Sequence, residues 1–426
     1  NLTTREMKYV SSGDGKLPLI TLISILSVSL TVNLPGLAIS PIMGKLDDVF
    51  PDTTQLQIQL LSVLPNLIII PFIIFSGKLA SMRNQTWVLS AGLAIFAFSA
   101  VLYFFAESMS ALILISCLLG VGCGLVIPIA AGLIAEHLYG KARFRALGME
   151  SGVSNGMVIL ATLFVGWMAD YGWHACFAVY LIPLIPLALM PYMTNRFVSR
   201  HHIAATPQDN KPTQAASGPD TTVSASAKAK GKLPLRTLAG LVALYLTITY
   251  CVIVFSYYLP FTMKHYGFGT RDVGVASAMF YVTATTGGFI LPWFLHRCGR
   301  TSPFVALGIS VIGIFMLGVM HTYASYIIGV LLIGFGYGIM QPVIYNKTTR
   351  IAPDQKSDTR FLSIVLTGNY IAIAIAPFVV EFFEFIFHDR SVDFPFFLNG
   401  IIMAATILIG LIMRRSFIWN TDPSEV

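Results

Sequence analysis

Twelve long apolar segments dominate this chain of 426 residues and leave few folds open to it. Each holds about 20 mostly apolar residues, the length that an α-helix needs to cross the hydrocarbon core of a bilayer. Only helices or closed β-barrels span lipid, because every backbone polar group must find a partner there. Barrel strands alternate in hydrophobicity over about 10 residues, whereas these segments are continuous and about twice as long. The sequence therefore predicts an all-α membrane protein with twelve transmembrane helices.

A polar stretch divides the twelve segments into two groups of six. The first group covers residues 17–43, 55–80, 87–105, 109–135, 145–168 and 174–194. The second group covers residues 236–262, 272–295, 302–320, 323–346, 360–386 and 394–413. Residues 195–235 are rich in Ala, Ser, Thr and Pro and hold almost no large apolar side chain, which predicts a flexible linker. We therefore expect two pseudo-symmetric six-helix bundles, at 17–194 and 236–414, with tails at 1–16 and 415–426.

The charged residues are few, and their placement predicts an orientation. They make up 11% of the chain, less than half of the quarter that is typical of soluble domains. With the amino terminus inside, four of the 27 Lys and Arg residues fall in outer loops, and the other 23 lie on the inner side; the four are Lys45, Lys264, Arg271 and Arg390. Short basic loops of this kind mark the cytosolic side rather than a nucleic-acid-binding face. We expect a multi-pass protein of the plasma or inner membrane with both termini and the linker in the cytosol.

A glycine-rich run occurs once in each predicted bundle. Residues 118–128 read "LLGVGCGLVIP", and residues 332–342 read "LIGFGYGIMQP". The matching positions are Gly120, Gly124 and Pro128 in the first run and Gly334, Gly338 and Pro342 in the second. Glycines four residues apart share a helix face and let another helix approach closely, and a proline loosens the helix before it. The pair predicts two equivalent helices that face the central cavity and act either by close packing or as bending joints.

Short motifs occupy the predicted loops. "FSGKLASMRNQT" (75–86) follows the second segment, and "PWFLHRCGRT" (292–301) lies at the equivalent place in the second half. "AEHLYGKARFRALG" (135–148) and "YGWHACF" (171–177) lie at the next two connections. Together with two parallel six-helix halves and a basic linker, these motifs resemble the major facilitator superfamily, over nearly the whole chain. The resemblance implies a transporter, and its general look is that of the drug and metabolite efflux branch.

The loop motif of that family reads glycine-x-leucine-x-aspartate-arginine-x-glycine-arginine. The residues that resemble it are Gly77, Leu79 and Arg83 in the first half and Arg297, Gly299 and Arg300 in the second. Ser81 and His296 stand where the aspartate is expected, and Ser116 stands where proton-driven exporters carry an arginine. The resemblance therefore supports the fold more firmly than the direction of transport.

Glu150 is an acid inside a predicted span. It lies about 7 Å along its helix from the start of the segment, at 1.5 Å per residue. Burial there would raise its pKa towards neutrality, as a proton-coupling group needs, and ionisable groups within membranes are functional candidates. The alternative is a structural ion pair with Lys141, Arg143 or Arg145.

Neutral polar side chains form the predicted substrate cavity. The amides are Asn33, Asn66, Asn155, Gln341 and Asn369, and each either joins helices or binds a solute. In the resembled family, the helices that carry these amides line or flank the central cavity. Tyr257, Tyr258 and Tyr281 belong to a set of tyrosines in the second half that either contact an apolar or cationic solute or lie at the lipid interface. The cavity is expected to be neutral and aromatic.

The remaining function classes find little support. The sequence lacks HExxH and GxSG-like motifs, and GVGCG is neither a phosphate-binding GxxxxGK[ST] loop nor preceded by a strand. We therefore expect no enzyme, no cofactor and no metal, and the two-half repeat argues against a channel or receptor. The prediction is a monomeric secondary active transporter in a lipid bilayer, with a small amphipathic or weakly polar solute and protons as partners. Proton-coupled efflux is favoured, and proton-coupled uptake of a metabolite is the alternative.

Overall fold

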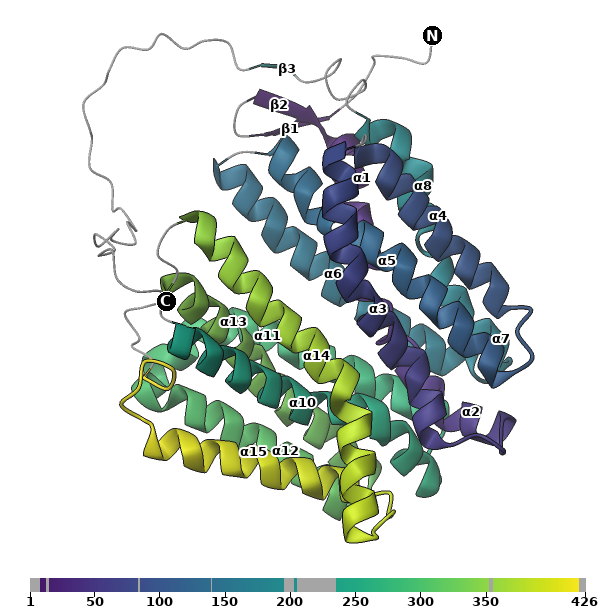
Figure 1. Cartoon of the computed structure of the whole chain (residues 1–426), viewed down its shortest axis with the longest axis vertical. Coiled ribbons are helices and arrows are strands. Elements are labelled where there is room, and N and C mark those ends of the chain that lie inside the picture. The colour runs from purple at the N-terminus through teal and green to yellow at the C-terminus, as the bar shows by residue number, and fades with distance from the viewer. Residues whose placement is uncertain are drawn as a thin grey trace.

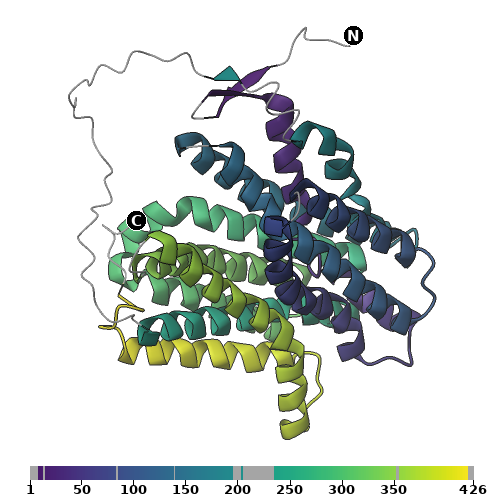
Figure 2. The ribbon, with the colours of Figure 1, turned by 45° about the horizontal axis from the view of Figure 1, so that its top comes forward.

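The computed structural model describes residues 8–12, 15–82, 85–138, 140–194, 203–204, 235–351 and 355–420, and these are mostly helical. The helices of the N-terminal half are α1 (Leu19–Val28), α2 (Met43–Val49), α3 (Gln55–Met82), α4 (Gln85–Tyr103), α5 (Met109–His137), α6 (Gly140–Met168), α7 (Trp173–Cys176) and α8 (Leu184–Leu189). Those of the C-terminal half are α10 (Leu235–His265), α11 (Thr270–Cys298), α12 (Ser302–Val319), α13 (Tyr323–Ile351), α14 (Gln355–Phe387) and α15 (Phe394–Ile412). Figures 1 and 2 show the two halves as separate bundles set at an angle to each other.

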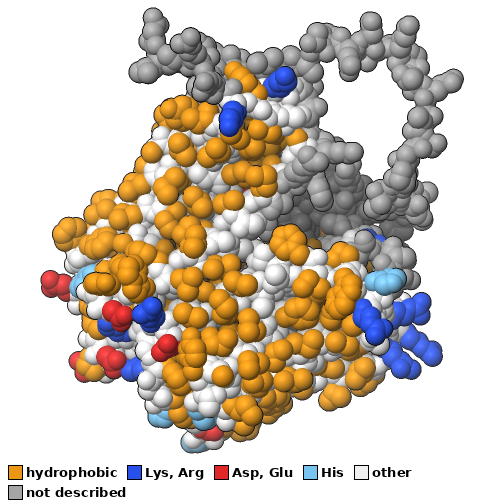
Figure 3. Space-filling model, turned by 180° about the vertical axis from the view of Figure 1, so that it is seen from behind, with side chains coloured by type: hydrophobic (Ala, Val, Ile, Leu, Met, Phe, Trp, Pro, Cys, Tyr) orange, Lys and Arg blue, Asp and Glu red, His pale blue; other side chains and the backbone are white. Residues whose placement is uncertain are grey.

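The predicted spans have helical counterparts. Nine helical segments of the described residues are long and apolar enough to cross a membrane, and one of them, Thr270–Val319, contains both α11 and α12. Two shorter apolar helices, Leu19–Thr31 and Gly152–Met168, are consistent with the remaining two predicted spans. Apolar side chains cover a broad belt of the surface in Figure 3, and charged side chains gather at its edges. The all-α membrane fold is confirmed.

The first predicted segment, residues 17–43, is not one continuous helix. α1 ends at Val28, and after a short 3-10 turn the chain leaves helical geometry until Ser40–Ile42, which leads into α2. Pro35 has no backbone N–H to donate, and Gly36 has a φ of 86°, in the left-handed region that glycine tolerates. The Pro-Gly pair thus breaks the helix, and the expectation of an unbroken first span was wrong for this reason.

Prolines also divide the sixth predicted segment, residues 174–194. Pro183, Pro186 and Pro191 each remove a backbone donor. Short helices α7 and α8 therefore alternate with the 3-10 turns η3 (Phe177–Leu181) and η4 (Met190–Met193).

Two regions outside the predicted bundles also have a defined structure among the described residues. β1 (Tyr9–Ser11), β2 (Gly15–Pro18) and β3 (Ile203–Ala204) form a small antiparallel sheet in the order β1-β2-β3. β3 belongs to the predicted linker, of which residues 195–202 and 205–234 lie outside the described residues. At the other end, the ring of Trp419 stacks on Phe304 with centroids 5.3 Å apart. The beginning of the predicted tail 415–426 therefore packs on the C-terminal bundle.

The glycine run of α5 is a packing device on two opposite faces. A Cβ added at Gly120 would lie 2.9 Å from the Cα of Pro65 in α3, and one at Gly124 would lie 2.5 Å from the Cβ of Phe72. The middle glycine, Gly122, faces α4 instead. α5 is therefore held tightly between α3 and α4, because glycines two positions apart point to opposite sides of a helix.

The run of α13 repeats this arrangement in the C-terminal half. A Cβ at Gly338 would lie 2.9 Å from the Cα of Ala284 in α11, and Gly334 also faces α11. Gly336 faces α12 on the opposite side. Both α5 and α13 continue as helices through Pro128 and Pro342, and none of these glycines lines the central cavity described below. The structure therefore shows the close packing, while the bending role stays a prediction.

The two halves meet at the end of the molecule that carries α2, which we call the α2 end. Lys264 Nζ lies 2.8 Å from Asp47 Oδ2 and 2.6 Å from Asp48 Oδ1. The hydroxyl of Ser256 donates to that of Ser40 at 3.0 Å. Other close contacts across this junction join Gly166 of α6 to Gly274 of α11, where an added Cβ would meet backbone. Small residues and an ion-pair cluster therefore fasten the α2 end.

Candidate functional site

A cavity of about 180 Å³ lies between the two halves. The broken part of the first helix reaches it with Val32, Asn33, Pro35 and Leu37, and α3, α6, α10, α11, α13 and α14 complete the wall. None of the described residues that line it is Asp, Glu, Lys, Arg or His. A cavity with polar but uncharged walls at a two-bundle interface is suited to a small organic molecule.

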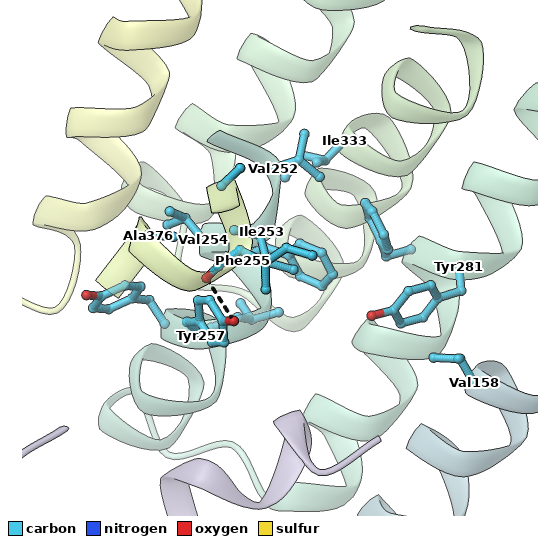
Figure 4. Close-up of a cluster of buried hydrophobic side chains, with 14 of the residues drawn as sticks. Val158, Val252, Ile253, Val254, Phe255, Tyr257, Tyr281, Ile333 and Ala376 are labelled. Carbon is cyan, nitrogen blue, oxygen red and sulfur yellow. Dashed lines mark hydrogen bonds between the residues drawn. The ribbon is translucent and has the colours of Figure 1, made fainter. Parts of the chain in front are cut away.

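Six of the eight predicted cavity residues lie in this wall: Asn33, Asn66, Asn155, Tyr281, Gln341 and Asn369. The other two, Tyr257 and Tyr258, are not part of it. The hydroxyl of Tyr257 donates to the backbone carbonyl of Ile373 at 3.2 Å, and Figure 4 shows this bond as a dashed line. Tyr258 lines a second cavity of about 270 Å³ whose wall also includes Glu381, Glu384 and Arg390. The rotation of α10 about its own axis decides which of its side chains face the cavity, and hydropathy does not reveal that rotation.

On the N-terminal side the amides are only partly bonded. Asn33 Nδ2 donates to Asn155 Oδ1 at 3.4 Å, a long bond between the broken segment and α6. Asn66 Nδ2 donates to the carbonyl of Ser62 at 2.7 Å, one turn earlier on its own helix. Among the described residues, Asn33 Oδ1 and Asn155 Nδ2 have no hydrogen-bond partner, and both residues line the cavity, so this pair has one acceptor and one donor to offer a solute.

On the C-terminal side the polar groups form a connected network. Gln341 Nε2 donates at 3.0 Å to the hydroxyls of both Tyr245 and Tyr345, which lie 2.8 Å from each other. Asn369 Oδ1 accepts from the hydroxyl of Thr249 at 3.0 Å and from that of Tyr337 at 3.4 Å. Such a network fixes the side chains of α10, α13 and α14 relative to one another. Gln341 and Asn369 are therefore presented to the cavity in defined orientations.

Four aromatic side chains also line the C-terminal wall, and of these only Tyr281 was predicted from the sequence. Phe280 and Tyr281 meet edge to face with centroids 5.1 Å apart, and Phe280 lies 6.2 Å from the ring of Tyr337. Tyr370 also lines the cavity. A signal existed for Tyr337, because it precedes Gln341 by four residues and so shares its helix face.

Glu150 lies on α6, partly exposed and outside the wall of the cavity. The side chains of its predicted structural partners Lys141, Arg143 and Arg145 lie outside the described residues. Asn155, five residues further along the same helix, is in the wall, about 7.5 Å away along the axis. The coupling role of Glu150 therefore stays a prediction.

Of the loop-motif residues, Gly299 has a φ of 55° and ends α11, while Arg297 and Arg300 are exposed beside it. Gly77 lies in α3, and Arg83 lies outside the described residues. The structure thus gives Gly299 a helix-ending role, for which a left-handed glycine is suited.

Comparisons with known proteins agree with this architecture. The chain is 25% identical to the "Niacin transporter NiaP" of Acinetobacter baylyi (strain ATCC 33305 / BD413 / ADP1) over 302 residues, which is 66% of this chain and 68% of the relative. Its fold matches the crystal structure of a D-xylose-proton symporter with a TM-score of 0.65 at 16% identity, over 96% of this chain and 98% of the other. It also matches the nucleoside transporter NupG with a TM-score of 0.69 at 10% identity, over 92% and 99%.

The family comparison covers most of the molecule. The model of the Major Facilitator Superfamily matches residues 19–377, and a second match covers residues 241–424. These ranges include both halves, the broken first helix and every element that lines the cavity. The resemblance predicted from the loop motifs and the two-half organisation is thereby confirmed at the level of the family, and the chain belongs to the Major Facilitator Superfamily of transporters.

Proposed function

We propose that this protein is a secondary active transporter for a small, ring-bearing organic solute that forms hydrogen bonds. The observation that carries the proposal is the wall of the central cavity, whose described residues include five amides, several aromatic rings and no charged side chain. The amides supply donors and acceptors, and the rings supply flat apolar surface. A strongly anionic solute such as an organic phosphate would find no countercharge there.

The volume of the cavity narrows the class of solute further. A volume of about 180 Å³ suits a single-ring molecule better than the bulky amphipathic compounds that the sequence-based efflux prediction includes. The relative named as a niacin transporter handles a solute of this kind, a pyridine ring with one carboxyl group. We therefore propose heteroaromatic or aromatic monoacids and their neutral analogues as the solute class.

The direction of transport has two candidates. The sequence favours proton-coupled efflux, whereas the small polar cavity and the similarity to a niacin transporter favour proton-coupled uptake. The distribution of Lys and Arg favours cytosolic termini, an orientation that puts the fastened α2 end outside. On this orientation the molecule is closed towards the outside, and opening the α2 end gives the opposite state of an alternating-access cycle.

A ligand screen tests the solute class directly. Purified full-length protein is expected to gain thermal stability with single-ring carboxylic acids or carboxamides, because a ligand that binds only the folded state raises Tm. Hits are then followed in proteoliposomes with an imposed pH gradient, acid inside or acid outside, which distinguishes uptake from efflux. Stabilisation by bulky cationic amphiphiles alone would contradict the proposal.

Asn155→Ala is expected to weaken solute binding about 5- to 150-fold. The substitution removes a cavity amide, and a lost hydrogen bond in a buried site costs about 1–3 kcal/mol. The measurement is Kd by calorimetry. Asn399→Ala is the matched control, since Asn399 is buried in α15, donates to the carbonyl of Pro395 at 2.6 Å and does not line the cavity. It should lower Tm and leave Kd unchanged; equal Kd changes in both variants would contradict the assignment of Asn155.

Lys264→Glu is expected to loosen the α2 end, because it places a third acid beside Asp47 and Asp48. Partly exposed ion pairs contribute about 0.2–1 kcal/mol each, so the ratio of closed to open molecules should fall a few-fold. A cysteine introduced at buried Ser40 reports the change through faster labelling by a membrane-impermeant maleimide, measured against the parent with its native cysteines. The double variant Asp47→Lys/Lys264→Glu should slow the labelling again, and a rate unchanged by either variant would show that the cluster does not hold this end closed.

A further inference from the structure

We infer that the cavity binds its acid solutes in the protonated, uncharged form, so that the coupled proton crosses the membrane on the carboxyl group of the solute. The inference rests on the proposed function and adds the carrier of the proton. It follows from the charges around the cavity, from the hydrogen-bonding groups that face it and from the place of the nearest acid.

Few titratable groups face the cavity among the described residues. Among the described residues, the broken first helix, α3, α6 and α10 contribute none to the wall. α11, α13 and α14 contribute only the phenols of Tyr281, Tyr337 and Tyr370, which cannot supply a positive charge. A carboxylate that entered would lose its hydration without gaining a countercharge, which is unfavourable, whereas a neutral carboxylic acid avoids that loss.

The hydrogen-bonding groups of the cavity wall complement a protonated carboxyl group. A protonated carboxyl group presents one donor and one acceptor along a single edge, and a carboxylate presents acceptors only. The facing carboxamides of Asn33 and Asn155 leave the acceptor Asn33 Oδ1 and the donor Asn155 Nδ2 without partners among the described residues. The acid O–H would donate to the first and the acid carbonyl would accept from the second, while the ring of the solute would lie against Phe280 and Tyr281 on the opposite half.

The position of Glu150 supports the same inference. It is outside the wall, about 7.5 Å along α6 from Asn155, so a proton bound to it would not touch the solute. The transport cycle that we infer needs no protein carboxylate. The solute anion takes a proton from hydronium on the entry side, crosses as the neutral acid and releases the proton to water on the exit side, so one anion and one proton move together without net charge.

The inference fixes how affinity depends on pH. A carboxyl group with a pKa of about 4 is protonated in about one molecule in 1,000 at pH 7. If only that form binds, the apparent Kd falls about tenfold for each unit by which the pH falls, because only the binding-competent fraction counts. The carboxamide analogue has no such proton, so its Kd should not change between pH 7.5 and 5.5.

The experiment measures binding to purified full-length protein in detergent, which avoids passive leak of weak acids through lipid. The probes are benzoic acid, benzamide and benzenesulfonate, each titrated at pH 7.5, 6.5 and 5.5. We expect a Kd for the acid that falls about 100-fold over this range, a constant Kd for the amide and no binding of the sulfonate, which stays ionised. Glu150→Gln should keep the slope of the acid.

The remaining outcomes separate the two proposals. A constant Kd for the acid, together with binding of the sulfonate, overturns the inference, because the site then recognises anions, and leaves the proposed solute class standing. A slope that disappears in Glu150→Gln also overturns it and assigns the proton to Glu150. If neither acid nor amide binds at any pH, the proposed solute class itself is wrong.

Discussion

Gly338→Leu is expected to abolish transport and to destabilise the protein by about 3 kcal/mol or more. Already a Cβ at this position would lie 2.8 Å from the carbonyl carbon and 2.9 Å from the Cα of Ala284, and it would collide with that carbonyl's oxygen. These are backbone atoms of α11, so a change of side-chain rotamer cannot relieve the collision. Overpacking in a core forces the backbone to shift, which destabilises the fold. α13 must then move away from α11. Because Tyr337 and Gln341 of α13 line the cavity, this movement displaces both side chains.

The matched control for this substitution is Gly308→Leu. Gly308 is also inside a helix of the C-terminal half, α12, but an added Cβ would meet nothing within 4 Å. Both variants lose one helix glycine and gain the same side chain, so the difference in Tm and in transport rate per folded molecule isolates the packing against α11. Equal losses in the two variants would show that the contact with Ala284 is unimportant.

The equivalent position of the other half extends the test. Gly124 faces Phe72 and Ile69 of α3 in the same way that Gly338 faces α11. The sequence repeat anticipated this equivalence, because matching glycines at matching places in two halves require matching neighbours. What the sequence did not separate was packing from bending, since a glycine serves both. The faces of Gly122 and Gly336, opposite to those of their flanking glycines, became visible only with the neighbouring helices in place.

The amides of the cavity were predictable for a physical reason, and the rings were not. An Asn or Gln inside a lipid-spanning segment must find a partner or a solute, so Asn33, Asn155 and Gln341 stood out in apolar surroundings. Aromatic side chains are equally at home against lipid, within a bundle or in a cavity. For this reason the sequence pointed to Tyr257, which the structure turns towards Ile373, and not to Phe280.

The break in the first helix escaped prediction because hydropathy measures only whether a segment can stay in lipid. Residues 17–43 are mostly apolar, and a proline alone is tolerated in membrane helices. The decisive residue is Gly36 beside Pro35, since only the left-handed φ turns a kink into an unwound stretch. Non-helical backbone at this depth is tolerated where it lines a cavity, as Val32 to Leu37 do.

Gly36→Ala is accordingly expected to abolish solute binding as well as to destabilise the fold. Two effects combine at this position. Alanine at a φ of 86° costs about 1–2 kcal/mol in backbone strain. Its Cβ would also lie 2.6 Å from the carbonyl oxygen of Ser62 and would collide with the carboxamide nitrogen of Asn66, which bonds that same carbonyl. Relief requires moving either Asn66 or the unwound segment that carries Asn33, and both line the cavity.

Gly267→Ala separates strain from collision. Gly267 has the same φ of 86° but lies in the turn between α10 and α11, where an added Cβ meets nothing within 4 Å. This control should lose about 1–2 kcal/mol of stability through backbone strain alone and keep the Kd of the parent. Gly36→Ala should lose more stability and show no measurable binding by calorimetry. If both variants bind the solute equally well, the unwound segment does not shape the site, and the cavity must owe its selectivity to the network of Gln341 and Asn369 on the other half.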